Sequence, residues 1–352
     1  MSNVISIGLP KRPNLSQRQG ALIKSFACHR RAPEDVYWLK ENAELLNILV
    51  AGKARLAAQD LAVYQGFYDT LEERLRFFPQ YYRFLLSICL DLEDLGMEGD
   101  TAQRLCDAVA ARRSAASELS DLQRAEAQHL LSRRGFGPLS SDVRARLFTF
   151  ISDPNTFSLP NKKAAYELTH IVFYLSNYGR QALCLSESAI TSLEFAGLLA
   201  YLDQDADLLA EVCLAMRFSG RTPSDIWEDW LAHELGGFVL KPVPDGPIQD
   251  AYHEYLVTSW WAGEAGMTGF AGAPAIGGVE ISRLNRGRGP LRAISERLYQ
   301  LGSERRADWL EMRGLLNDSI APEQRHILAE AVQSSAQFPA FFEQFSRAKR
   351  VC

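Results

Sequence analysis

The sequence predicts an all-α protein, built either as a large multi-helix bundle or as an α/α-toroid-like array of paired helices. Apolar residues recur at helical spacing along nearly the whole chain, which is the primary sign of amphipathic helices. Alternating runs of valine, isoleucine and threonine, which are typical of half-buried strands, are almost missing. With 352 residues, 47% of them hydrophobic, the chain has enough apolar material for a large core.

Helix boundaries are marked by proline, acidic residues and glycine. Segment 33–52 begins with Pro33 and two acidic residues and ends at Gly52, which is the usual order of helix start and stop signals. Similar segments follow one another with short connections. We therefore predict helices over 16–30, 33–52, 57–77, 80–95, 100–113, 119–133, 141–151, 161–178, 187–203, 205–219, 223–235, 248–265, 290–301, 304–316, 322–335 and 337–347.

The chain is predicted to form one continuous domain with two helical regions. Residues 1–16 lack helical spacing and form an irregular N-terminal segment, which an N-terminal helical region over 17–151 follows. Two prolines interrupt the pattern within 152–161, and a C-terminal helical region covers 161–347. Eight glycines between residues 263 and 289 predict an irregular loop, more mobile than its surroundings, that is either a surface excursion or a lid contacting a ligand.

Charge and hydropathy exclude several classes of function. The net charge is −5, and no run of basic residues interleaves with aromatic residues, so nucleic-acid binding is not expected. No apolar stretch approaches the roughly 20 residues that span a bilayer, and the start MSNVISIGLPKRP lacks the apolar core of a secretory signal. The six cysteines are scattered without a C-x-x-C pair, which favours buried thiols over a zinc knuckle. We therefore expect a cytoplasmic protein without membrane insertion.

A first pair of titratable residues lies in the segment AAYELTHIVFYLSNYGR, residues 164–180. On a helix, Glu167 and His170 share a face with Tyr174 and Tyr178, whereas the other faces are apolar. Such a helix is expected to be surrounded by other helices, so both groups should point into a packed or cavity-lining region. A buried carboxylate needs a partner, which would be the histidine, a metal ion or a hydrogen-bond donor.

The start of the same helix carries two lysines. Asn161 suits the N-cap position, and Lys162 and Lys163 follow it directly. Free backbone N–H groups and two ammonium groups would together bind an anion, whereas the alternative is that both lysines are simply solvated.

A second pair at the same spacing, Asp250 and His253, lies in IQDAYHEYLVTSWW, residues 248–261. Helical bundles that hold two metal ions use a Glu-x-x-His motif on two helices and a single carboxylate from each of two others. Glu211 is enclosed by apolar residues, shares a helix face with Asp207 and is the leading single carboxylate. Mixed imidazole and carboxylate ligation suits iron or manganese, and a single zinc ion is the other option. Further carboxylate candidates are Glu194, Glu126, Asp91 and Glu93.

These residues predict a metal-dependent enzyme with a cavity between helices, which requires His170 and His253 to face a common interior space with Glu211 as its third wall. Paired iron would imply oxidation of an apolar substrate, whereas a single zinc ion would imply activation of water or a thiol. The alternative is a non-catalytic scaffold or protein-binding module with structural His–acid pairs, whose tryptophan-bearing helices and arginine-containing loop meet a partner protein. The predicted metal ligands are His170, His253, Glu167, Glu211 and Asp250, of which Glu167 and Glu211 are also the predicted catalytic residues.

Four segments carry a resemblance to a known group of proteins. THIVFYLSNYG (169–179), DADLLAEV (205–212), YHEYL (252–256) and FFPQYYRFLLSICLDLEDLG (77–96) resemble a group of uncharacterised bacterial helical proteins known only as a domain of unknown function. The resemblance concerns about a third of the chain and implies no activity or substrate. It draws attention to His170, Glu211 and His253, whereas the two carboxylates that complete the pairs rest on spacing alone.

Overall fold

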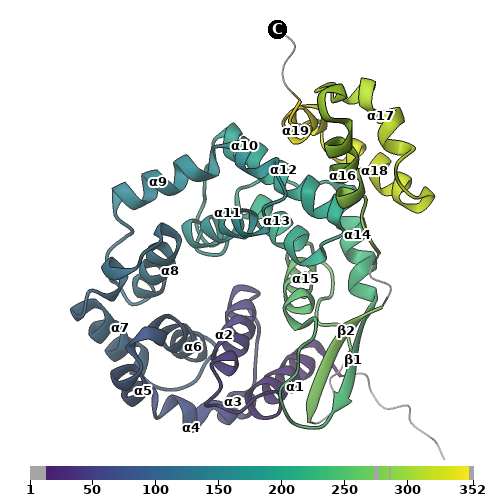
Figure 1. The fold of residues 1–352 in the computed structure, drawn as a ribbon. Helices are drawn as coiled ribbons and strands as arrows, with labels where there is room; N and C mark the ends of the chain where they lie inside the picture. Colours follow the sequence, from purple (N-terminus) through teal and green to yellow (C-terminus); the bar gives the residue numbers. More distant parts are fainter. Residues whose placement is uncertain (1–12, 273–276, 285–286, 349–352) are drawn as a thin grey trace, which may run out of the picture.

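Helices make up most of the computed structural model, in which residues 13–272, 277–284 and 287–348 are described (Figure 1). The prediction of an all-α array is confirmed, since the strands in these residues form one two-stranded ribbon. The α-helices are α1 (Leu15–Cys28), α2 (Val36–Ala51), α3 (Ala58–Leu61), α4 (Gln65–Tyr68), α5 (Leu71–Phe77), α6 (Tyr82–Asp94), α7 (Thr101–Ala111), α8 (Asp121–Ser132), α9 (Ser141–Ile151), α10 (Pro154–Phe157), α11 (Lys162–Leu175), α12 (Glu187–Asp203), α13 (Ala206–Phe218), α14 (Asp225–Gly236), α15 (Tyr252–Glu264), α16 (Leu291–Leu301), α17 (Trp309–Asn317), α18 (Pro322–Ser334) and α19 (Phe338–Phe345).

Local capping chemistry explains several helix starts. Asp35 caps α2 by accepting a hydrogen bond from the Tyr37 N–H, and Asn161 caps α11 by accepting one from the Ala164 N–H, as the sequence suggests. The segment predicted as a single helix over 57–77 is instead divided into α3, a short 3-10 helix (Ala62–Tyr64), α4 and α5. Further 3-10 turns are Pro79–Tyr81, Ser114–Ser117 and Gly302–Glu304.

Consecutive helices alternate between an inner and an outer layer of a ring (Figure 1). The inner helices α2, α6, α8, α11, α13 and α15 each contact the next one, and α15 contacts α2, which closes the ring. Helices α1, α5, α7, α9, α12 and α14 lie outside and pack against the inner layer. Of the two predicted architectures, the chain therefore adopts the toroid-like array of paired helices.

The inner helices run parallel to one another, because an outer helix carries the chain back from the end of each inner helix to the start of the next. Lys162, Asp207 and His253, from the first turns of α11, α13 and α15, line one pocket. Ala51 and Phe218, from the last turns of α2 and α13, line another pocket together with the end of α15. One end of the ring therefore gathers the helix N-termini of α11, α13 and α15, where the candidate site lies.

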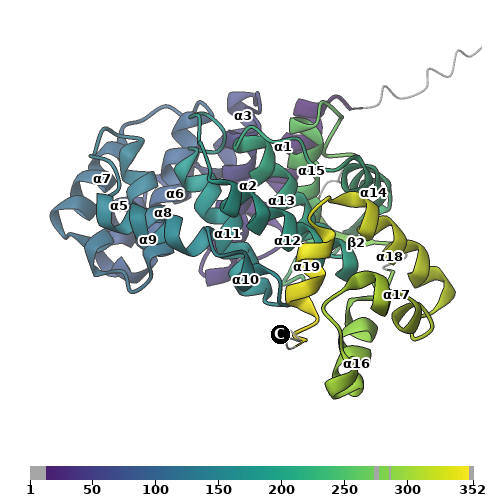
Figure 2. The ribbon, with the colours of Figure 1, turned by 90° about the horizontal axis from the view of Figure 1, so that it is seen from above.

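Helices α16 to α19 form a cluster beside the ring (Figure 2). Of these, α16, α18 and α19 contact α12, and α18 also contacts α14. Phe338 and Phe342 of α19 pack on Trp309 of α17, with ring centroids 5.1 and 5.2 Å apart, which gives this cluster its own aromatic centre.

The loop predicted over 263–289 is not wholly irregular, because it contains strand β2 (Gly278–Arg283), which pairs antiparallel with β1 (Phe238–Val243). The strands are far apart in sequence, so no short hairpin signal marked them. Arg283 of β2 is nearly buried and forms ion pairs with Glu234 at 2.6 Å and Glu254 at 3.2 Å. Residues 273–276 and 285–286 of the predicted loop lie outside the described residues, and its mobility stays a prediction.

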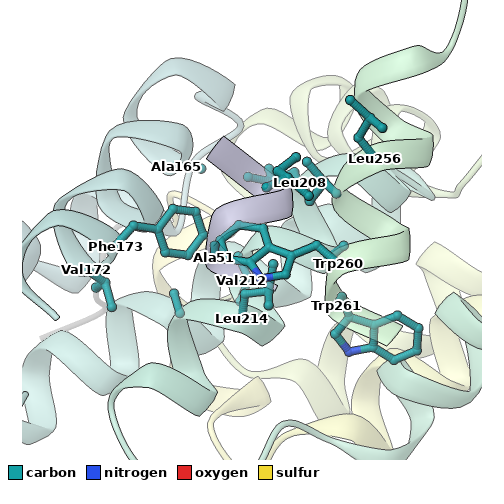
Figure 3. Close-up of a cluster of buried hydrophobic side chains, with 14 of the residues drawn as sticks. Ala51, Ala165, Val172, Phe173, Leu208, Val212, Leu214, Leu256, Trp260 and Trp261 are labelled. Carbon is teal, nitrogen blue, oxygen red and sulfur yellow. The ribbon is translucent and has the colours of Figure 1, made fainter. Parts of the chain in front are cut away.

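The core beneath the candidate site is aromatic. Figure 3 shows Phe173 of α11 and Trp260 of α15 facing each other beside Val212 of α13. Their ring centroids are 5.3 Å apart, and Phe218 lies 5.7 Å from Trp260, so three inner helices are joined by contiguous ring contacts. Rigid helices packed in this way hold polar side chains on their inner faces in fixed positions.

Among the described residues, no helix combines the length and apolar character that crossing a membrane requires.

Candidate functional site

Two neighbouring inner helices, α13 and α15, bring Asp207, Glu211 and His253 together. Asp207 and Glu211 lie one turn apart on the same face of α13, and His253 lies in the first turn of α15, which packs against α13. One nitrogen or oxygen atom from each side chain can be chosen so that all three lie within 4.8 Å of one another. We call this group the acid–histidine cluster.

Asp207 and His253 form the outer part of the acid–histidine cluster. The His253 Nδ1 atom lies 2.9 Å from both carboxylate oxygens of Asp207, and the Tyr166 hydroxyl donates to one of these oxygens at 3.1 Å. Burial opposes the charged form of both groups, but their mutual attraction outweighs it. The pKa of His253 is therefore raised to about 10, and the pKa of Asp207 is lowered below its ordinary value.

Glu211 forms the inner part of the cluster and is almost fully buried. Its carboxylate accepts a hydrogen bond from the Thr169 hydroxyl at 2.5 Å and lies 3.6 Å from the Nδ1 atom of His170. Burial raises the pKa of Glu211, and the nearby imidazoles only partly offset this effect. A carboxyl group with a raised pKa beside two histidines is a usual feature of functional sites.

His170 is oriented by the backbone of its own helix. Its Nδ1 atom lies 2.7 Å from the carbonyl oxygen of Tyr166, which can only accept, so Nδ1 carries a proton. In the neutral form of the ring the lone pair is therefore on Nε2, which makes no hydrogen bond within the described part of the chain. His170 lines the central cavity, so this free nitrogen is available to a ligand there.

Two pockets lie near the cluster. The larger, of about 520 Å³, lies inside the ring and is lined by α2, α6, α8 and α11. The smaller, of about 430 Å³, lies at the N-terminal ends of α11, α13 and α15 and includes Asp207 and His253. Tyr166 lines both pockets, whereas none of the three cluster residues lines the larger one.

The other predicted ligands lie apart from the acid–histidine cluster. Glu167 is on the cavity wall but only 4.0 Å from Lys163, its partner one turn earlier. Asp250 precedes the start of α15, so it does not share a helix face with His253 as its spacing suggested. Both of its oxygens are bound, by Arg30 at 2.8 and 2.9 Å and by the Ile281 N–H at 2.7 Å.

The further carboxylate candidates are also bound elsewhere. Glu126 pairs with Arg83, Asp91 pairs with Arg133 at 2.8 Å, Glu194 accepts from Ser335, and Glu93 pairs with Arg134 at 2.9 Å.

Asp207 is the cluster member that the predicted ligand set omits. The available signal was its i, i+4 spacing to Glu211, since side chains four apart on a helix lie on one face. Tyr166 and Thr169 are likewise absent from the predicted set. Their contacts with the cluster cross from one helix to another, which spacing within a single helix does not reveal.

The donor atoms suit a single divalent metal ion. Neighbouring ligand atoms around one ion with bonds of roughly 2.0–2.2 Å are about 3–3.5 Å apart. The separation of His253 Nδ1 from Asp207 is 2.9 Å, and ligand atoms of Asp207, Glu211 and His253 lie within 4.8 Å of one another, so only small movements would be needed. One imidazole with two carboxylates is a donor set that fits manganese, iron or zinc.

Comparison with known proteins gives a family without a defined activity. A family model described as a domain of unknown function, DUF6902, matches residues 1–348. The resemblance to such a family that the sequence suggests is thereby confirmed. No curated protein and no solved structure matches the chain significantly.

Proposed function

The chain belongs to the family of the DUF6902 domain of unknown function, and from its site we propose that it is a metal-dependent enzyme with one divalent ion held by Asp207, Glu211 and His253. The observation that carries the proposal is the convergence of their ligand atoms within 4.8 Å. Asp207 and His253 also line a pocket, and Tyr166, which donates to Asp207, lines the central cavity, as expected of an active site rather than of a closed structural site.

A divalent ion in this position would supply activation of bound water at neutral pH. Asp207 and Glu211 would neutralise the charge of the ion, and the Tyr166 and Thr169 hydroxyls would orient the two carboxylates. His170 would accept a proton through Nε2, since the Tyr166 carbonyl holds Nδ1 protonated. This assignment favours a hydrolytic or hydration reaction on a substrate bound in the central cavity.

The paired-iron version of the hypothesis has less support. It needs a second set of converging ligands, whereas one group of three such side chains occurs in the described residues. The central cavity is also lined by many charged and polar groups, which suits a polar substrate better than an apolar one.

A non-catalytic scaffold remains the competing proposal, and one observation favours it. The contacts of His253 with both oxygens of Asp207 already satisfy the two groups as an ion pair. In that case the cluster would join α13 to α15 and would bind no metal.

Metal content separates the two proposals. We expect about one equivalent of manganese, iron or zinc in protein purified without chelator, measured by inductively coupled plasma mass spectrometry. His253→Ala and Glu211→Gln should each lower the bound metal at least about tenfold, since losing a ligand removes a large part of the affinity. Circular dichroism should show that both variants keep the helical fold.

His326→Ala is the matched control, because His326 forms an exposed histidine–carboxylate pair with Glu330 on α18, away from the cluster. It should retain the metal. Metal-free wild-type protein that also fails to take up manganese, iron or zinc on titration would contradict the proposal and favour the scaffold.

A further inference from the structure

The central cavity has the size of a small-molecule site. Its volume of about 520 Å³ falls within the usual range of ligand pockets, about 300–1,000 Å³. Its walls are the inner faces of α2, α6, α8 and α11, together with Tyr178 just beyond α11. The side chains on these walls therefore determine which class of ligand the cavity fits.

The charges on the cavity walls cancel. Three acids, Glu44, Glu126 and Glu167, face three bases, Lys40, Arg83 and Lys163. Each base is next to one of the acids: Lys40 lies 3.7 Å from Glu44, Lys163 lies 4.0 Å from Glu167, and Arg83 pairs with Glu126. The lining therefore has no net field that selects an anion or a cation.

One wall of the cavity is a continuous aromatic surface. His170, Tyr174 and Tyr178 follow one another at intervals of four residues, with successive ring centroids 6.0 and 6.2 Å apart. The ring of His129, from α8, lies 5.8 Å from Tyr174 and 5.3 Å from Tyr178. Such a surface offers ring faces to the C–H groups of a ligand.

Hydrogen-bonding groups lie beside this aromatic surface. The Tyr174 hydroxyl makes no hydrogen bond within residues 13–272, 277–284 and 287–348, and the same holds for His170 Nε2. The Lys163–Glu167 pair is long, so a group that both donates and accepts can bridge it. Hydroxyl groups have this dual capacity, whereas an apolar ligand would leave the cavity's polar atoms without partners.

We infer that the central cavity binds an uncharged, hydroxyl-rich ligand of the kind that a sugar or another cyclic polyol presents. The aromatic wall receives its C–H face, and the paired charges and the Tyr174 hydroxyl receive its hydroxyl groups. That the ligand is a substrate rests on the proposed function. Binding of the ligand does not require the metal.

Isothermal titration calorimetry tests the inference on the full chain, once treated with EDTA and once loaded with manganese. The neutral probes are glucose, galactose, xylose, maltose, cellobiose and inositol, and the charged or apolar probes are inorganic phosphate, spermidine and laurate. At least one neutral probe should bind saturably in both forms of the protein. Binding in the EDTA-treated form would support the sugar site even if no metal proved to bind.

Tyr174→Ala and Glu167→Gln should each weaken that binding at least about tenfold, because the first removes a stacking face and the second replaces one charged acceptor oxygen by an NH2 donor. The matched controls Tyr299→Ala and Glu187→Gln change exposed residues of α16 and α12 and should leave it unchanged. Saturable binding confined to phosphate, spermidine or laurate would overturn the inference, as would no saturable binding by the neutral panel or equal binding by all four variants.

Discussion

At the scale of single residues, burial decides which titratable groups carry a charge. His129 lies on the cavity wall with its side chain almost fully buried, between Tyr174 and Tyr178. Burial, together with the positive charges of Arg133 and Arg180, lowers the pKa of His129 to about 3. The folded protein therefore holds this imidazole neutral at every pH above about 3.

The neutral His129 predicts a loss of stability in acid. Its pKa in the unfolded chain is near 6.5, so the unfolded state takes up a proton first as the pH falls. The stability of the fold should therefore decrease from pH 6.5 downward until the pH reaches about 3. His129→Gln, which cannot take up a proton, should lose about 2–3 kcal/mol less than the wild-type protein between pH 6.5 and 4.5. Urea unfolding at the two pH values measures this difference, and equal losses would show that His129 is not held neutral.

At the scale of elements, the end of α11 shows what helical spacing does not predict. The sequence extends this helix to residue 178, but it ends at Leu175, and Asn177, Tyr178 and Gly179 all have positive φ angles, of 49°, 52° and 76°. Tyr178 nevertheless lies beside Tyr174 on the cavity wall, so the spacing of four residues places side chains on one face even beyond the end of the helix. Periodicity locates the face of a helix better than its last residue.

The turn after α11 depends on Gly179. A Cβ atom there would lie 2.4 Å from the ring of Phe218, and its φ of 76° is one that side chains other than glycine rarely adopt. Gly179→Ala should therefore destabilise the fold by about 1–3 kcal/mol, measured by urea unfolding. Gly220→Ala is the control, because φ at Gly220 is 75° but the added Cβ would meet nothing within 4 Å. A Gly179→Ala variant no less stable than Gly220→Ala would show that the contact with Phe218 is not restrictive.

The sequence predicted individual residues of the candidate site but not the group that converges in space. His170, Glu211 and His253 were marked by titratable groups in otherwise apolar helices, and the structure places all three around α13. The prediction that Asp250 and His253 share a helix face was wrong, because α15 begins two residues after Asp250, at Tyr252. Helix boundaries depend on capping and tertiary contacts, which a short sequence pattern specifies poorly.

At the scale of the whole molecule, a buried ion cluster joins the two ends of the ring. Arg30, just after α1, binds Asp250 before α15 and Glu41 of α2 and donates to the carbonyl oxygen of Val279 in β2 at 2.7 Å. All three charged side chains are almost completely buried. The network thus connects the first helix pair to the last inner helix, a pairing between distant segments that the sequence could not reveal.

Removing Arg30 should weaken the closure of the ring. Arg30→Met would leave the carboxylates of Glu41 and Asp250 buried with fewer partners, so we expect the free energy of unfolding to fall by about 3–5 kcal/mol. Arg146→Met is the control, since Arg146 forms an exposed pair with Asp121 and should change stability by less than about 1 kcal/mol. Chemical denaturation measures both variants. Similar small losses would show that the buried network contributes little to closing the ring.

The proposed metal site places one ion between Asp207, Glu211 and His253 at one end of the ring. Anomalous X-ray scattering from a crystal soaked in manganese tests it most directly, because the signal locates the ion without assuming its ligands. We expect one strong peak roughly 2.0–2.2 Å from a nitrogen of His253 and from oxygens of Asp207 and Glu211. An empty cluster at saturating manganese, with His253 still 2.9 Å from Asp207, would contradict it.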